Sequence, residues 1–158
     1  MKNEDKFLVS KKVNLASPKA GAKIIDVSDD FFAKCDRMLN DTDPIFIDDK
    51  YDDHGKWMDG WESRRKRVEG NDWAIIGLGG RCSIKDVTID TSHFTGNYPP
   101  VASLDFSSNQ SYEAGSLDWH TLLKKQILKG DHINEFKLLK NENVTYVRLN
   151  IFPDGGVA

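Results

Sequence analysis

The sequence predicts a mainly β fold, a sandwich or barrel of short strands with one or two short helices. Several segments alternate apolar and polar residues, and this period of two is typical of a strand with one buried face. Turn-forming residues separate these segments, at Tyr98-Pro99-Pro100, at Gly115 and at residues 153–156. Short strands separated by turns, with little helical periodicity, are typical of β-sandwiches and barrels.

Four segments carry the strand signals, namely residues 73–78, 84–91, 102–106 and 144–152. The first, WAIIGL, is apolar throughout and so predicts a fully buried strand. The last is the strongest, because its residues divide cleanly onto two faces. One face carries Thr145, Val147, Leu149 and Ile151, and the other carries Tyr146, Arg148, Asn150 and Phe152.

Helical signals are fewer, and the clearest predicts a helix over residues 28–39. Ser28 can serve as its N-cap, followed by Asp29 and Asp30, where the helix dipole favours negative charge. The apolar residues that would share one face are Phe31, Phe32, Cys35, Met38 and Leu39. Residues 119–128 predict a weaker second helix. Residues 1–12 are charged and are expected to be loosely held.

Length and composition restrict the class of protein. A chain of 158 residues is expected to form one domain. The 39% hydrophobic content argues against disorder, and the net charge of −3 gives no reason to expect a nucleic acid or an anionic membrane as partner. Cys35 and Cys82 lack metal-ligand spacing and are expected to be free. No apolar run suits a membrane span or a secretory signal, so we expect a cytoplasmic protein.

The densest group of functional residue types lies in residues 55–67, GKWMDGWESRRKR. Arginines can bind a carboxylate through their planar forks, Asp59 and Glu62 can accept from N–H groups, and tryptophans can exclude water. This mixture suits a site for a small polar ligand. A structural loop could have the same composition, and the residue types alone leave both interpretations open.

Residues 90–100, DTSHFTGNYPP, form a second candidate segment. His93 could act as an acid or base, and Thr95 and Asn97 could hydrogen-bond a ureido group. A capped corner between a strand and a turn explains the same residues, and residue types favour that structural interpretation. His132 could also be a general base, although a histidine in a polar loop is more often only solvated.

Other chemistries receive less support. Six aspartates between Asp41 and Asp53 could bind a hard cation, but they miss the calcium-loop spacing, so a solvated acidic loop is favoured. We therefore predict no metal site and no cofactor, and we leave dependence on a divalent metal open. Gly-x-Ser-x-Gly is absent, and Cys35 lies on the apolar face of its predicted helix. A serine or cysteine nucleophile is not expected.

Taken in order, these segments resemble the allantoicase family from about residue 12 to residue 158. The resemblance rests on GKWMDGWESRRKR, the following Asp72-Trp73, DTSHFTGNYPP and VRLNIFPDGGVA. It extends to Asn14-Leu15-Ala16, Gly21, DDFFA at residues 29–33, Phe46-Ile47, Lys50, Trp119 and Leu122, which match the first repeat of the family.

The resemblance implies a galactose-binding-like jelly-roll sandwich that hydrolyses allantoate to ureidoglycolate and urea, in purine degradation through allantoin. Such a substrate needs a cationic anchor for its carboxylate, acceptors for its ureido groups, and an acid or base at the departing urea. The catalytic candidates are Asp59, Glu62, His93 and His132. The substrate-binding candidates are Lys56, Trp61, Arg64, Arg65, Thr95 and Asn97.

The family has two tandem repeats, and this chain resembles the first. We therefore expect residues 13–158 to form one repeat that lacks its last strand and the second repeat. A homo-oligomer or a second-repeat partner could then complete the pocket. Two alternatives stay open: a non-catalytic sandwich that binds a small molecule or carbohydrate, and a half-enzyme that acts only beside the missing repeat.

Overall fold

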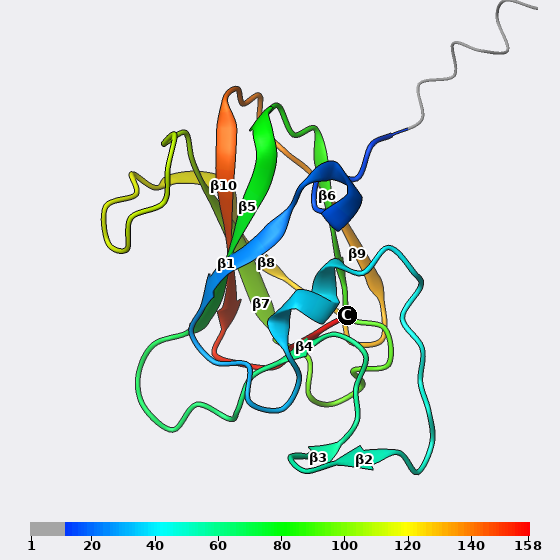
Figure 1. The fold of residues 1–158 in the computed structure, drawn as a ribbon. Coiled ribbons are helices and arrows are strands. Elements are labelled where there is room, and N and C mark those ends of the chain that lie inside the picture. Colours follow the sequence, from blue (N-terminus) through cyan, green and yellow to red (C-terminus); the bar gives the residue numbers. More distant parts are fainter. Residues whose placement is uncertain (1–11) are drawn as a thin grey trace, which may run out of the picture.

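A five-stranded antiparallel sheet is the framework of the molecule. The computed structural model describes residues 12–158, so all but one residue of the segment expected to be loosely held lie outside the described part. The sheet has the strand order β1-β5-β10-β7-β8 (Figure 1). Its strands are β1 (Lys23–Val27), β5 (Asp72–Cys82), β7 (Val101–Ser107), β8 (His120–Ile127) and β10 (Val144–Phe152).

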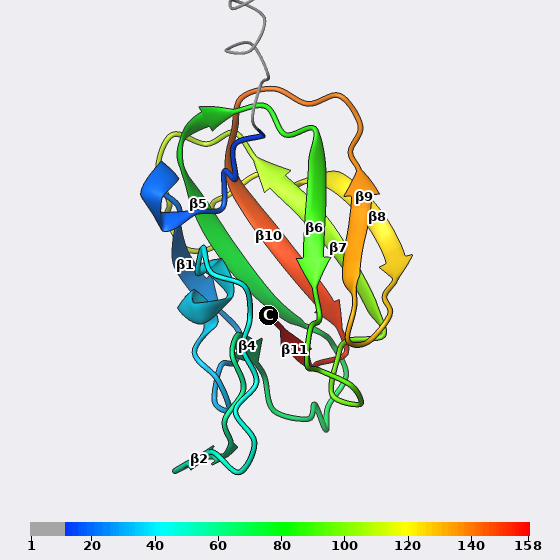
Figure 2. The same cartoon turned by 90° about the vertical axis from the view of Figure 1, so that its right-hand side faces the viewer.

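A second layer covers one face of this sheet and is made of short pairs. Strand β6 (Asp86–Asp90) pairs with β9 (Ile133–Lys137), and β4 (Trp61–Glu62) pairs with β11 (Gly156–Val157). Figure 2 shows β6 and β9 in front of β10 and β7, with β11 near the C-terminal end of β6. The short elements η2 (Pro18–Ala20), β2 (Tyr51–Asp52) and β3 (Gly55–Lys56) lie outside the two layers. The mainly β sandwich expected from the sequence is confirmed.

The central strand β10 fits its predicted pattern. Val147, Leu149 and Ile151 are buried in the core between the layers. On the opposite face, Arg148 donates two hydrogen bonds to Asp105 at 2.9 and 3.2 Å and lies over the Trp119 ring. All four strands predicted from alternation or apolar runs are present, as β5, β6, β7 and β10.

The two predicted helices were wrong in most of their extent. Of residues 28–39, only Cys35–Leu39 is helical, as the short 3-10 helix η3. Ser28 is not an N-cap, because its hydroxyl donates to Asp72 at 2.8 Å and accepts from the Trp73 amide at 2.9 Å. Tertiary partners thus take the polar groups that would have started the helix.

Residues 119–128 form strand β8, not a helix. The strand pairs antiparallel with β7, from Ile127 opposite Val101 to His120 opposite Phe106. The pairing shifts register on both sides of Leu104 in β7, and this breaks the apolar alternation of β8. Residues 119–128 therefore lacked the sequence signature of a strand. Across residues 12–158, no helix is long and apolar enough to cross a membrane.

Candidate functional site

Strand β4 places Glu62 at one end of the sandwich, among loops. The backbone of β4 is held on both sides, by β11 and by Ala33, whose N–H and C=O bond to Glu62 at 3.2 and 3.1 Å. Trp61 points into the core and is fully buried, with its indole N–H donating to the Asp29 carbonyl at 2.8 Å. Trp61 therefore anchors the strand and presents no surface to a ligand.

The Glu62 side chain is partly buried beside Asn97. The side-chain amide of Asn97 donates to Glu62 Oε1 at 2.8 Å. The backbone carbonyl of Asn97 accepts from the Gly156 N–H at 2.8 Å. Burial raises the pKa of Glu62, while the hydrogen bond from Asn97 opposes that shift. A carboxylate whose pKa is raised is a stronger base than an exposed one, which suits Glu62 to accept a proton.

Arg64, two residues farther along, is committed to Asp29. Its backbone N–H, Nε and Nη2 approach the Asp29 carboxylate at 3.0, 2.8 and 2.7 Å, and its guanidinium lies 5.0 Å from the Phe31 ring centroid. Burial alone would raise the pKa of Asp29, but bonds from the Arg64 and Phe31 amides and from the Arg64 side chain lower it. This pair fixes the loop after β1 against the segment after β4. Sequence reasoning missed it by assigning Asp29 to a helix terminus.

Arg65 is exposed, as are Arg64 and Arg67. Unlike Arg64, its side chain forms no hydrogen bond or ion pair with the described residues. The backbone of the next residue, Lys66, donates to Asp154 at 2.7 Å, so the segment has a defined path. On the other side, Gly60 lies so close to the C-terminal residues that an added Cβ would be 2.4 Å from the Val157 carbonyl oxygen. Its φ of +142° also favours glycine.

His93 belongs to a neighbouring group of side chains. It adopts a positive φ of 70°, its N–H donates to Asp131 at 2.8 Å, and its Nε2 lies 3.1 Å from the Pro44 carbonyl oxygen. The ring also stacks on Phe46, over which the Lys56 ammonium lies at 4.6 Å. The loop before β7 thus contacts residues 44–56.

The other candidates are separate from Glu62. Asp59 accepts from the Ile45 amide at 2.9 Å and so supports the acidic loop. Thr95 and His132 are exposed, and His132 contributes its backbone carbonyl to Thr91. Within residues 12–158, no hydrogen bond or ion pair joins Asp59, Thr95 or His132 to Glu62.

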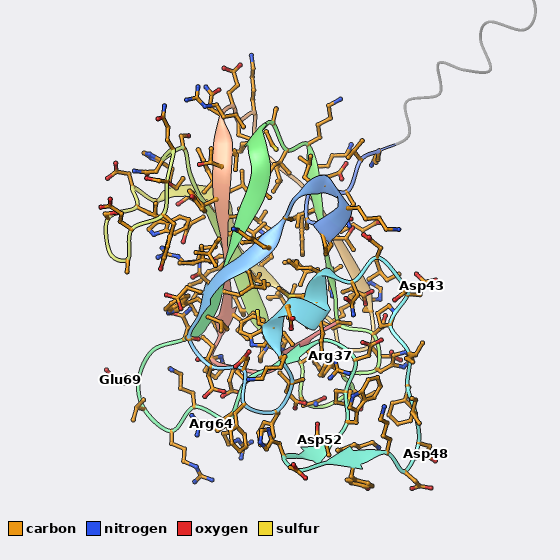
Figure 3. The ribbon with its side chains drawn as sticks, viewed as in Figure 1. Arg37, Asp43, Asp48, Asp52, Arg64 and Glu69 are labelled. Atoms are coloured by element: carbon orange, nitrogen blue, oxygen red, sulfur yellow. The ribbon has the colours of Figure 1, made fainter. Side chains whose placement is uncertain are left out.

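The aspartates of the acidic loop are not gathered at one point. Asp43, Asp48 and Asp52 are spread along the loop and the β2–β3 hairpin, well apart from one another (Figure 3). In the described part of the chain, no three His, Cys, Asp or Glu side chains are grouped so that they could hold a metal ion. The same loop carries Trp57, which has the Arg37 and Lys50 cations within 4.5 Å of its ring centroid.

A large groove lies elsewhere, between β6 and η3, with a volume of about 740 Å³. Of the ten predicted site residues it is lined by Asp59 alone. Glu62, Arg64 and Arg65 therefore lie apart from this groove.

The architecture and the loops define a galactose-binding-like β-sandwich that carries a partly buried acid and a set of arginines at one end. The chitosan-binding module 1 of a chitosanase/glucanase from Paenibacillus sp. IK-5 has this fold, with a TM-score of 0.57 at 16% identity over 92% of this chain and 93% of that module. At this identity the likeness concerns the fold alone.

The chain belongs to the allantoicase repeat family, whose model matches residues 13–158. It is 51% identical over 145 residues to a probable allantoicase of Acinetobacter baylyi, covering 92% of this chain and 43% of that protein. The crystal structure of allantoicase from Saccharomyces cerevisiae superposes with a TM-score of 0.80 at 28% identity, over 98% of this chain and 49% of that one. The chain thus spans less than half the length of the curated relatives it matches.

Proposed function

We propose that this chain takes part in the hydrolysis of allantoate to ureidoglycolate and urea, in the degradation of purines through allantoin in the cytoplasm. Support comes from membership of the allantoicase repeat family and from the high identity to relatives named probable allantoicases. The observation that carries the proposal is Glu62, a partly buried carboxyl with a raised pKa, oriented by Asn97.

The reaction adds water across one C–N bond of the substrate. In the proposed mechanism the Glu62 carboxylate takes a proton from water, the resulting hydroxide oxygen bonds to the central carbon, and the C–N bond to one ureido group breaks. The departing nitrogen takes up the proton, so that urea leaves neutral and the carboxylate is restored. Asn97 is a positioning residue that aims the Glu62 carboxylate.

A cationic anchor for the substrate carboxylate is assigned to Arg65, because Arg64 is already bonded to Asp29. An arginine can bind a carboxylate through two parallel hydrogen bonds. Arg64 instead positions the segment that carries Arg65. We assign no proton transfer to His93, whose ring lies against Pro44 and Phe46.

A second repeat or a second copy of the chain is proposed to complete the pocket. The relatives contain more than twice the matched length, and the Glu62 end of this chain is open to solvent around Arg65. Isolated chain and paired chain are therefore expected to differ in activity.

The test measures urea released from allantoate by purified protein. We expect Glu62→Gln to lower kcat by about 10²- to 10⁴-fold, as for loss of a general base, with an unchanged circular dichroism spectrum. Arg65→Ala should raise KM more than it lowers kcat. Asp43→Asn, an exposed change in the acidic loop, is the control and should keep full activity.

If the isolated chain releases no urea, the second half of the A. baylyi relative is added as a separate polypeptide. Activity that appears only in the mixture and is lost with Glu62→Gln supports a half-enzyme. Full activity of the Glu62→Gln protein, or no urea in either setting, contradicts the proposal.

A further inference from the structure

A wide β-bulge interrupts the central sheet at the end of the sandwich opposite Glu62. Residues 78–81 of β5 lie opposite the single residue Thr145 of β10. The pairing of β5 with β1 also stops at Gly77. Across residues 12–158, neither neighbouring strand therefore pairs in register with the bulged residues. Bulges are common next to functional sites, because they redirect side chains and leave backbone groups out of the ladder.

The bulged residues form one wall of a pocket of about 250 Å³. The complete lining is Leu78, Gly79, Gly80, Arg81, Gln110, Thr145 and Tyr146. Pockets for drug-sized ligands typically have about 300 to 1,000 Å³, so this one suits a smaller molecule. A ligand of a few non-hydrogen atoms fits it, whereas a peptide or an oligosaccharide does not.

The polar side chains of this pocket favour a negatively charged ligand. Arg81 is exposed, and its guanidinium forms no hydrogen bond or ion pair with the described residues. The hydroxyl of the half-buried Tyr146 also has no hydrogen-bond partner there, whereas Thr145 donates to two backbone carbonyls near the end of β7. The lining contains no Asp or Glu, although the chain has a net charge of −3. An arginine without an acidic partner is suited to bind an anion.

Two glycines of the bulge serve different purposes. Gly79 packs against η2, where an added Cβ would clash with the carbonyl oxygen of Ala20. At Gly80 an added Cβ would meet no atom within 4 Å, and φ lies outside the left-handed range. Neither packing nor backbone conformation therefore requires a glycine at residue 80. A missing side chain at this point of the wall lets a ligand approach the backbone closely.

We propose that this pocket binds a small carboxylate that carries a planar apolar body. Arg81 holds the carboxylate through its planar fork, and backbone N–H groups of the bulge donate to the same anion. The apolar body lies against Leu78 and the Tyr146 ring. This arrangement uses the acid-free lining, the unpaired arginine and the open backbone at Gly80 together.

The pocket is separate from the Glu62 end of the molecule. Strand β10 runs from the pocket, at Thr145, to Phe152 near the other end, which is about 23 Å at the usual rise of a strand. Figure 1 shows this end of β5 and β10 at the top of the molecule and β4 in its lower part. The inference concerns a second site and does not depend on the proposed hydrolysis.

The test titrates sodium benzoate into the ¹⁵N-labelled protein and follows the backbone amides by NMR. The amides of residues 79–81 should shift and saturate, and Arg81→Ala should weaken this binding by about tenfold or more. Gly80→Val fills the open space at the wall and should also weaken binding, with an unchanged circular dichroism spectrum. Lys124→Ala, which removes an exposed cation from β8, is the control and should bind benzoate like the wild type.

Acetate and inorganic phosphate are titrated in the same way, to separate the body of the ligand from its charge. Acetate should bind about tenfold more weakly than benzoate, because it buries less apolar surface. Phosphate that binds as tightly as benzoate would assign the pocket to an inorganic anion and overturn the proposal. Unsaturated shifts at residues 79–81, or equal benzoate affinity of Arg81→Ala and wild type, would overturn it too. Glu62→Gln should leave these shifts unchanged, so a failure of the proposed hydrolysis is distinguishable from a failure of this site.

Discussion

The five-stranded sheet and the loop end that carries Glu62 are stabilised in different ways. The sheet rests on strand pairing and on repeated apolar contacts, such as Leu149 between Ala74 and Leu104. The loop end rests on a few polar bonds between residues far apart in sequence, such as Asp29 with Arg64 and Glu62 with Asn97. Stability in the sheet is spread over many residues, whereas single side chains decide the geometry of the loops.

The largest effect is expected for Leu149→Ala, which would break the framework. Leu149 is 5% exposed in the central strand, and its truncation should cost about 2 to 5 kcal/mol of unfolding free energy. For a domain of this size that lowers Tm by about 5 to 15 °C. Thermal and urea unfolding would measure it. Leu139→Ala, at a residue that is 76% exposed, is the control and should change stability by less than about 0.5 kcal/mol.

The second-largest loss of stability is expected where the polar bonds of the loop end are removed. Asp29→Ala should cost about 2 kcal/mol, because the Arg64 and Phe31 amides and the Arg64 side chain lose their acceptor. Arg64→Ala should cost less, since its side chain is 60% exposed and solvent screens the pair.

The pH dependence sharpens this prediction for Asp29. Because the folded state lowers the pKa of Asp29 below 3.8, its contribution is present above that pH and is lost as the pH falls through the folded value. The difference in unfolding free energy between wild type and Asp29→Ala should therefore shrink below about pH 4. A difference that stays constant down to pH 2 would show that the charge of Asp29 has no part in stability.

The same contrast explains what the sequence could predict. Alternation in residues 144–152 identified β10 and its faces, because a period of two follows directly from the geometry of a strand. The helix over residues 28–39 failed because Ser28 and Asp29 bond to Asp72 and Arg64, more than thirty residues away. Local patterns contain no information about such partners.

For the candidate site, residue types indicated the segment but not the roles. GKWMDGWESRRKR contains both Trp61, which is buried in the core, and Glu62, whose side chain meets Asn97. Strand alternation could have separated these two neighbours, but β4 is only two residues long. That Arg64 is bonded to Asp29, whereas Arg65 has no such partner among the described residues, could be seen only in the fold.

The smallest effect on stability is predicted for Glu62→Gln. The sign of this change in unfolding free energy distinguishes a site residue from a framework residue. Burial raises the pKa of Glu62 above 4.5, so the folded state favours the protonated form. The contribution of Glu62 to stability is then complete below pH 4.5 and is lost as the pH rises through the folded pKa. Glutamine stays neutral and can still accept from Asn97. Glu62→Gln should therefore raise stability at pH 7.5, by no more than about 1 kcal/mol, and leave it unchanged at pH 4.

Differential scanning calorimetry across this pH range would measure the change in stability. Glu69→Gln, in the exposed loop after β4, is the control and should show no gain in stability at pH 7.5. A gain at pH 7.5 together with loss of urea release would mean that the protein keeps a destabilising charge because the reaction uses it. Equal Tm values for Glu62→Gln and wild type at every pH would remove the physical basis for Glu62 as the base, whatever its position beside Asn97.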